Sequence, residues 1–113
     1  MASVRRSLHV TDTQWATPAA VPVFLLECYW PDVTLRHAAT AVARARSAAA
    51  SMTRDGRPVR YLHGVFVPGE ESLLCVFEAS SAGDVAETAR RAALRADRIV
   101  AAIDLRARRA TPA

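Results

Sequence analysis

The chain has 113 residues, of which 51% are hydrophobic and 23% charged, with a formal net charge of +4. This length and composition are ordinary for one globular domain. All 15 basic residues are arginine and there is no lysine or asparagine. Such a bias is typical of GC-rich coding, so the arginines are weak evidence for nucleic-acid binding.

Neither a membrane span nor an export signal is evident. No stretch approaches the ~20 apolar residues of a membrane helix. Arg5 and Arg6 are followed by the mixed segment 7–12, which lacks the apolar run of a signal peptide. We therefore expect a cytoplasmic protein.

The first half of the chain predicts an arm, a strand and a long helix. Residues 1–20 show no clear period and are expected to form a flexible or surface-draped arm. Residues 21–30 are a strongly apolar strand that ends at Pro31. Thr34 can cap a helix that runs to about Met52, with apolar residues at helical spacing.

A hairpin, a second helix and a last strand follow. Strands are predicted at 59–67 and 72–79, with Pro68 and Gly69 in a type II turn between them. Ser80 or Ser81 then caps a helix, and 99–105 is a fourth strand. The buried stripe of that helix is expected to comprise Val85, Ala89, Ala92 and Ala96. Residues 106–113 are a basic tail expected to fray.

The order β-α-β-β-α-β predicts a ferredoxin-like α+β domain over residues 21–105, with a four-stranded antiparallel sheet and both helices on one face. The open face is too apolar for water, which predicts a homodimer that packs sheet to sheet as a dimeric α/β barrel. Strand alternation assigns to the open face Val23, Leu25, Tyr29, Tyr61, Val65, Leu74, Val76, Val100 and Ala102, with Glu27, His63, Glu78 and Asp104.

Glu27, His63 and Glu78 stand where apolar residues would pack better, one in each of three strands. An ionisable group inside a sheet is costly unless it is paired or bound to a ligand. We therefore predict a polar pocket centred on Glu27 and His63. His63 could instead be a hydrogen-bonded strand histidine, Glu27 could pair with an arginine of a dimer mate, and Glu78 could point to water. Tyr29 and Tyr61 could donate to a ligand or simply pack.

The other cysteine, histidine and aspartate residues are weaker candidates for a functional site. Cys28 and Cys75 alternate with apolar residues that face the helices, which predicts reduced core thiols. His37 lies beside the apolar stripe of the first helix, and His9 lies in the arm; neither has a partner at metal-ligand spacing. Asp104 is expected to be a solvated charge at a strand end.

Three segments resemble a family of small bacterial ferredoxin-like proteins of unknown function that are often labelled nickel-binding. They are 24–31 (FLLECYWP), 59–64 (VRYLHG) and 74–80 (LCVFEAS), supported by ARRA at 89–92 and ADRI at 96–99. The resemblance covers roughly 21–105 and implies a dimer that binds nickel or another divalent transition metal. Under this hypothesis His63, Glu27 and Glu78 would be the ligands, and a dimer mate could complete the site.

The chain departs from the family pattern at four positions. Thr88 stands where relatives often have His, Gly64 where Ser often follows the strand histidine, and Ala93 and Arg95 where a Gly and a Pro are usual. If the helix histidine of relatives binds metal, this chain lacks that ligand.

Two other functions compete with metal binding. The first is a cofactor-free cyclase, isomerase or lyase acting on a small hydrophobic substrate. Glu27 would be its base, His63 its acid or oxyanion partner, and Tyr61 an orienting donor. The second is nucleic-acid binding, because RNA-recognition domains share this topology. Carboxylates on the open face would, however, repel the phosphates of a nucleic acid. We expect neither specific nucleic-acid nor membrane binding.

Overall fold

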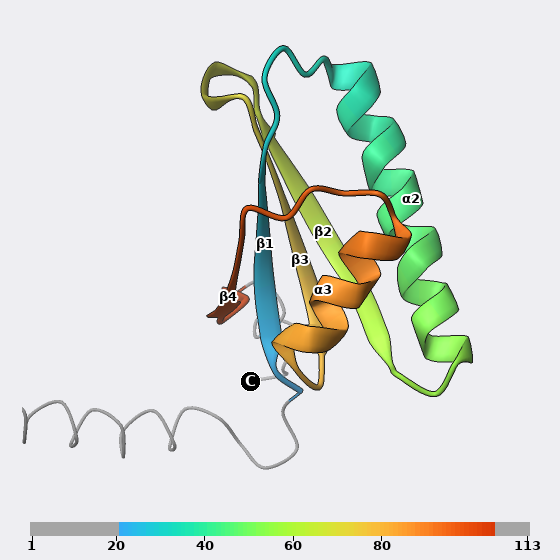
Figure 1. Cartoon of the computed structure of the whole chain (residues 1–113). Helices are drawn as coiled ribbons and strands as arrows, with labels where there is room; N and C mark the ends of the chain where they lie inside the picture. The colour runs from blue at the N-terminus through green and yellow to red at the C-terminus, as the bar shows by residue number, and fades with distance from the viewer. Residues whose placement is uncertain (1–20, 106–113) are drawn as a thin grey trace, which may run out of the picture.

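Four strands and two α-helices follow one another in the order β-α-β-β-α-β along residues 21–105, the part of the chain that the computed structural model describes (Figure 1). The elements are β1 (Val23–Tyr29), α2 (Leu35–Arg54), β2 (Val59–Val67), β3 (Ser72–Ala79), α3 (Ala82–Arg91) and β4 (Arg98–Ala102). A 3-10 turn, η1 (Pro68–Glu70), joins β2 to β3. The predicted arm and basic tail lie outside the described residues.

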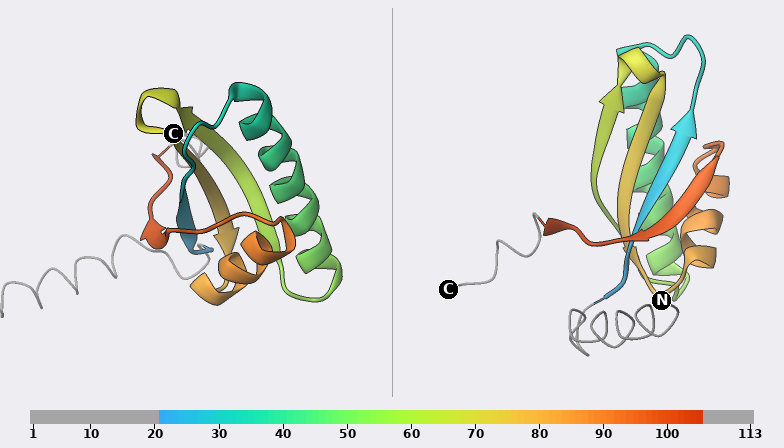
Figure 2. Two further views of the ribbon diagram at one scale, coloured as in Figure 1. Left: turned by 45° about the horizontal axis from the view of Figure 1, so that its top comes forward. Right: turned by 90° about the vertical axis from the view of Figure 1, so that its left-hand side faces the viewer.

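The strands form one antiparallel sheet in the order β2-β3-β1-β4, and both helices pack on the same face of it (Figures 1 and 2). This confirms the predicted ferredoxin-like α+β fold. No helix within 21–105 is long and apolar enough to cross a bilayer.

The core lies between the sheet and the helices. Leu26, Cys75 and Phe77 from the central strands are fully buried, as are Ala41 and Ala45 from α2. Most of the buried side chains of α2 are alanines, whose small size allows the helix backbone to approach the sheet closely.

Both predicted N-caps are confirmed. Thr34 Oγ1 accepts a hydrogen bond from the backbone N–H of His37 at 3.1 Å, and Ser81 Oγ accepts one from Asp84 at 3.2 Å. Each cap satisfies a backbone donor that the first helical turn would otherwise leave unpaired.

Three local predictions are wrong. The fourth strand, predicted at 99–105, is β4 (Arg98–Ala102) and ends three residues earlier. The β2–β3 connection is a 3-10 turn followed by Glu71 in the left-handed region (φ 50°), so it is not a type II turn at Pro68 and Gly69. The second helix ends at Arg91, and Ala93 then adopts a positive φ of 58°, so Ala96 is exposed instead of extending the buried stripe.

A β-bulge in β2 changes which side chains face the helices. Tyr61 pairs with Phe77, but His63 pairs with Val76, so Leu62 is an extra residue with no partner in β3. The bulge places Arg60 and His63 on the open face, and Tyr61 and Gly64 on the helix side. The prediction that Tyr61 shares a face with Glu27 and His63 is therefore wrong, because strict alternation does not hold across a bulge.

The bulge also brings Tyr61 against Gly64. A Cβ on Gly64 would lie 2.5 Å from Tyr61 Oη and 3.3 Å from the carbonyl oxygen of Leu74. Gly64→Ala should therefore lower the free energy of unfolding by about 1–2 kcal/mol through overpacking. In a Tyr61→Phe background this cost should shrink, because the nearest clashing atom is gone. Chemical denaturation of the two single variants and the double variant measures this coupling.

Gly69→Ala is the matched control, because no atom lies within 4 Å of a Cβ built there. It should change stability by less than about 0.5 kcal/mol. An equal cost of Gly64→Ala in both backgrounds would contradict the placement of the Tyr61 hydroxyl over Gly64.

Candidate functional site

His63 and Asp104 meet on the open face of the sheet. His63 Nε2 lies 3.4 Å from Asp104 Oδ2, and their side chains are 28% and 8% exposed. His63 is in β2 at one edge of the sheet, whereas Asp104 follows β4 at the other edge. The chain leaving β4 therefore crosses the strands on the side away from the helices (Figure 2). Asp104 is not the solvated strand-end charge that the sequence predicted.

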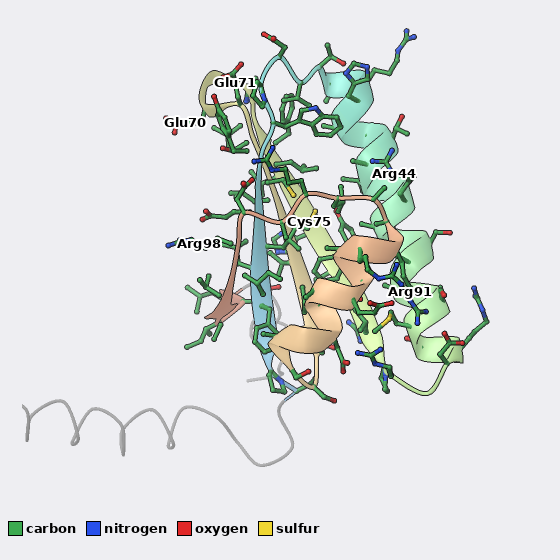
Figure 3. All side chains as sticks on the ribbon, viewed as in Figure 1. Arg44, Glu70, Glu71, Cys75, Arg91 and Arg98 are labelled. Carbon is green, nitrogen blue, oxygen red and sulfur yellow. The ribbon has the colours of Figure 1, made fainter. Side chains whose placement is uncertain are left out.

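The two glutamates on the open face are each paired with an arginine of the same chain. Glu27 Oε2 accepts a hydrogen bond from Arg98 Nη2 at 3.1 Å, and Glu78 Oε1 lies 3.7 Å from Arg60 Nε. Figure 3 shows Arg98 projecting from β4 away from the helices. Both arginines lie beside their partners in the sheet register, so these pairs follow from strand pairing.

The predicted ligands Glu27, His63 and Glu78 do not converge. They lie at three different levels of the sheet register, because Glu27 pairs with Leu74, His63 with Val76, and Glu78 with Arg60. Within 21–105 there is no group of three or more His, Cys, Asp or Glu side chains that could hold a metal ion. The described part of one chain therefore supplies a pair of donors, His63 and Asp104, rather than a full metal site.

Tyr61 lies on the opposite side of the sheet from Glu27. Its ring packs edge-on against Phe77, with centroids 5.6 Å apart, and Arg46 Cζ lies 4.9 Å from its centroid. Burial raises the pKa of the Tyr61 hydroxyl. Tyr61 therefore cannot orient a substrate for Glu27 within one chain.

The remaining histidine and tyrosine candidates have structural partners. The His37 ring stacks on Trp30 with centroids 6.0 Å apart. Tyr29 is exposed, and its hydroxyl donates to Glu71 at 3.3 Å. The Glu71 carboxylate raises the pKa of Tyr29.

Thr88, the position where relatives often have His, is fully buried in α3. Its Oγ1 donates to the carbonyl oxygen of Asp84 at 2.7 Å. Position 88 therefore lies on the helix side of the sheet, and the open-face pair does not depend on it.

Sequence reasoning missed the roles of Asp104 and Arg98. Arg98 directly precedes the apolar run 99–103, and its place opposite Glu27 could be predicted only from the β1–β4 register. Asp104 contacts a residue far away in the chain, and no local pattern signals that its segment crosses the sheet.

Together, these strands, helices and open-face polar residues define a small ferredoxin-like α+β protein. The chain belongs to the nickel responsive protein SCO4226-like family, whose family model matches residues 24–101. This confirms the resemblance drawn from the three sequence segments.

Among solved structures, the chain resembles the crystal structure of SCO4226 from Streptomyces coelicolor A3(2). The two share 22% sequence identity and superimpose with a TM-score of 0.54, over 69% of this chain and 91% of that chain. This likeness supports the fold. No curated protein matches the chain significantly.

Cys28 and Cys75 are free, buried thiols on the helix side of the sheet, where Figure 3 labels Cys75. Burial, more than any neighbouring charge, raises the pKa of Cys28 to about 11 and that of Cys75 to about 12. Both thiols should therefore fail to react with Ellman's reagent at pH 8 in the folded protein, because the thiolate is the reactive form.

In guanidinium chloride both thiols should react at once, which serves as the internal control. Rapid labelling of either cysteine under native conditions would contradict the buried, protonated state.

Proposed function

We propose that this protein is a cytoplasmic homodimer that binds nickel, or a similar divalent transition metal, through His63 and Asp104 on the open face of the sheet. The observation that carries the proposal is the largely buried imidazole–carboxylate pair at 3.4 Å. The family's name describes a response to nickel, which supports the same reading.

The spacing of the two donors suits one metal ion. Ligand atoms about 2.1 Å from a metal lie about 3.0–3.4 Å apart at octahedral or tetrahedral angles. Imidazole nitrogen and carboxylate oxygen are both suitable ligands for divalent metals such as nickel. The 3.4 Å separation of His63 Nε2 and Asp104 Oδ2 falls within this range.

Two donors are too few for a stable site, so the proposal requires further ligands. A second copy packed on the open face, with the twofold axis beside this pair, would supply its own His63 and Asp104 as the further ligands. Glu27 and Glu78 could join only if they released Arg98 and Arg60, so we place them outside the primary ligand set.

The apolar character of the open face supports such a dimer. Val65 is 46% exposed, and Leu25, Leu74 and Val100 lie half-buried on the same face. A contiguous apolar surface beside polar residues is typical of a protein–protein interface. The free thiols Cys28 and Cys75 are typical of a reducing compartment, which supports the cytoplasm.

A cofactor-free enzyme is the second candidate, because an imidazole beside a carboxylate is also an acid–base pair. In this version His63 would transfer the proton and Asp104 would orient the ring. The earlier assignment of Glu27 as base and Tyr61 as donor loses its support, since Glu27 is held by Arg98 and Tyr61 faces the helices.

Metal binding is tested by calorimetric titration of the metal-free full-length protein with nickel. We expect stoichiometric binding that His63→Ala abolishes, because it removes the nitrogen donor. Asp104→Asn should weaken binding by at least the ~10–100-fold seen when supporting groups of metal sites are lost.

His37→Ala is the matched control, because His37 is a second described histidine that stacks on Trp30 away from the open face. It should bind nickel as the parent protein does. Nickel binding that survives His63→Ala would contradict the metal proposal and favour a screen for organic substrates.

The proposed dimer is tested by Val65→Lys, which places a charge on the open face that the second copy would cover. Because Val65 is 46% exposed in the single chain, the variant should still fold. We expect sedimentation velocity to show a monomer with much weaker nickel binding.

Ala50→Lys, on an exposed position of α2, should remain dimeric. A Val65→Lys variant that stays dimeric would show that the copies associate through another surface.

A further inference from the structure

A second candidate site lies on the helix side of the sheet, where α2 meets the edge strand β2. An open groove of about 460 Å³ runs between these elements. This volume lies within the range of small-molecule sites in proteins. His63 reaches its rim, but the other lining residues take no part in the proposed metal site.

The groove has both apolar and polar walls. Leu35, Ala39 and Val42 line it from α2, and Leu62 and Phe66 line it from β2. Leu35 is 71% exposed at one end of the groove. An apolar ligand lying in the groove would cover this side chain.

Two polar groups lie together in the same groove. Arg46 Cζ sits 4.9 Å from the centroid of the Tyr61 ring. Neither Arg46 nor the Tyr61 hydroxyl makes an ion pair or hydrogen bond with any residue in 21–105. The absence of a side chain at Gly64 leaves room for the Tyr61 hydroxyl.

From these observations we infer that the groove binds a small organic carboxylate with an apolar body, such as a medium-chain fatty acid. The guanidinium of Arg46 and the hydroxyl of Tyr61 hold the carboxylate, and the apolar part lies along α2 toward Leu35. Arginine is well suited to this task, because its planar group can bind a carboxylate in bidentate fashion while it stacks on an aromatic ring.

The dimensions fit an elongated ligand. Arg46 and Leu35 are separated by about three helical turns, or ~16 Å along the axis of α2. The charge also selects the class of ligand, because Arg46 would repel an amine and attract an anion. The inference does not rest on the proposed metal site, because Arg46 and Tyr61, which hold the carboxylate, are not among its ligands.

The test is calorimetric titration of the metal-free full-length protein with decanoate, beside acetate and decanol. Decanoate should bind at least tenfold more tightly than either comparison compound, because only decanoate has both the charge and the apolar chain. Arg46→Gln should weaken decanoate binding about tenfold or more, and Tyr61→Phe about fivefold.

Two further variants make the result decisive. Arg54→Gln removes an arginine of the same helix that does not line the groove, and it should bind decanoate normally. Ala39→Trp fills the groove from an exposed position, so it should fold and lose binding.

The inference is overturned if decanoate and decanol bind equally, or if Arg46→Gln or Ala39→Trp binds as the parent does. Nickel titration of the same variants should be unchanged. Failure of the carboxylate site is thereby distinguished from failure of the metal site.

Discussion

The β-bulge at Leu62 is the constraint on which both candidate sites depend. In a regular strand Tyr61 and His63 would point to the same face. The extra residue breaks that alternation, so His63 turns to the open face while Tyr61 and Gly64 turn to the helices. One short stretch of an edge strand thereby carries polar groups to both sides of the sheet. Bulges are common at sheet edges and beside functional sites, where they redirect a side chain.

The elements were predictable because their signals are local. The spacing of apolar residues, together with the N-caps Thr34 and Ser81, correctly predicted where α2 and α3 begin. The bulge was not predicted, although a glycine inside a strand is a known sign of a bulge or a close approach, and Gly64 was that sign. The end of α3 was also misjudged, since an alanine at positive φ has no sequence signal.

The candidate site was only partly predictable, because its partners are far apart in the sequence. Strand parity correctly put Glu27, His63 and Glu78 on one face, but it contains no information about register across strands. The register places an arginine beside each glutamate. The course of the chain after β4 brings the Asp104 carboxylate to His63. Long-range pairing of this kind depends on the whole fold and not on a motif.

The arginine pairs also bear on how the open face could be covered. An unpaired carboxylate buried between two sheets would cost several kcal/mol, whereas a paired one costs far less. Because Glu27 and Glu78 each lie beside an arginine of opposite charge, a second sheet could pack over both pairs without burying a net charge. Both glutamates also lie at different levels of the sheet register from His63, which places them outside the proposed ligand set. Sheet-to-sheet packing and metal binding by His63 and Asp104 are therefore compatible, whereas metal binding by the two glutamates would oppose the packing.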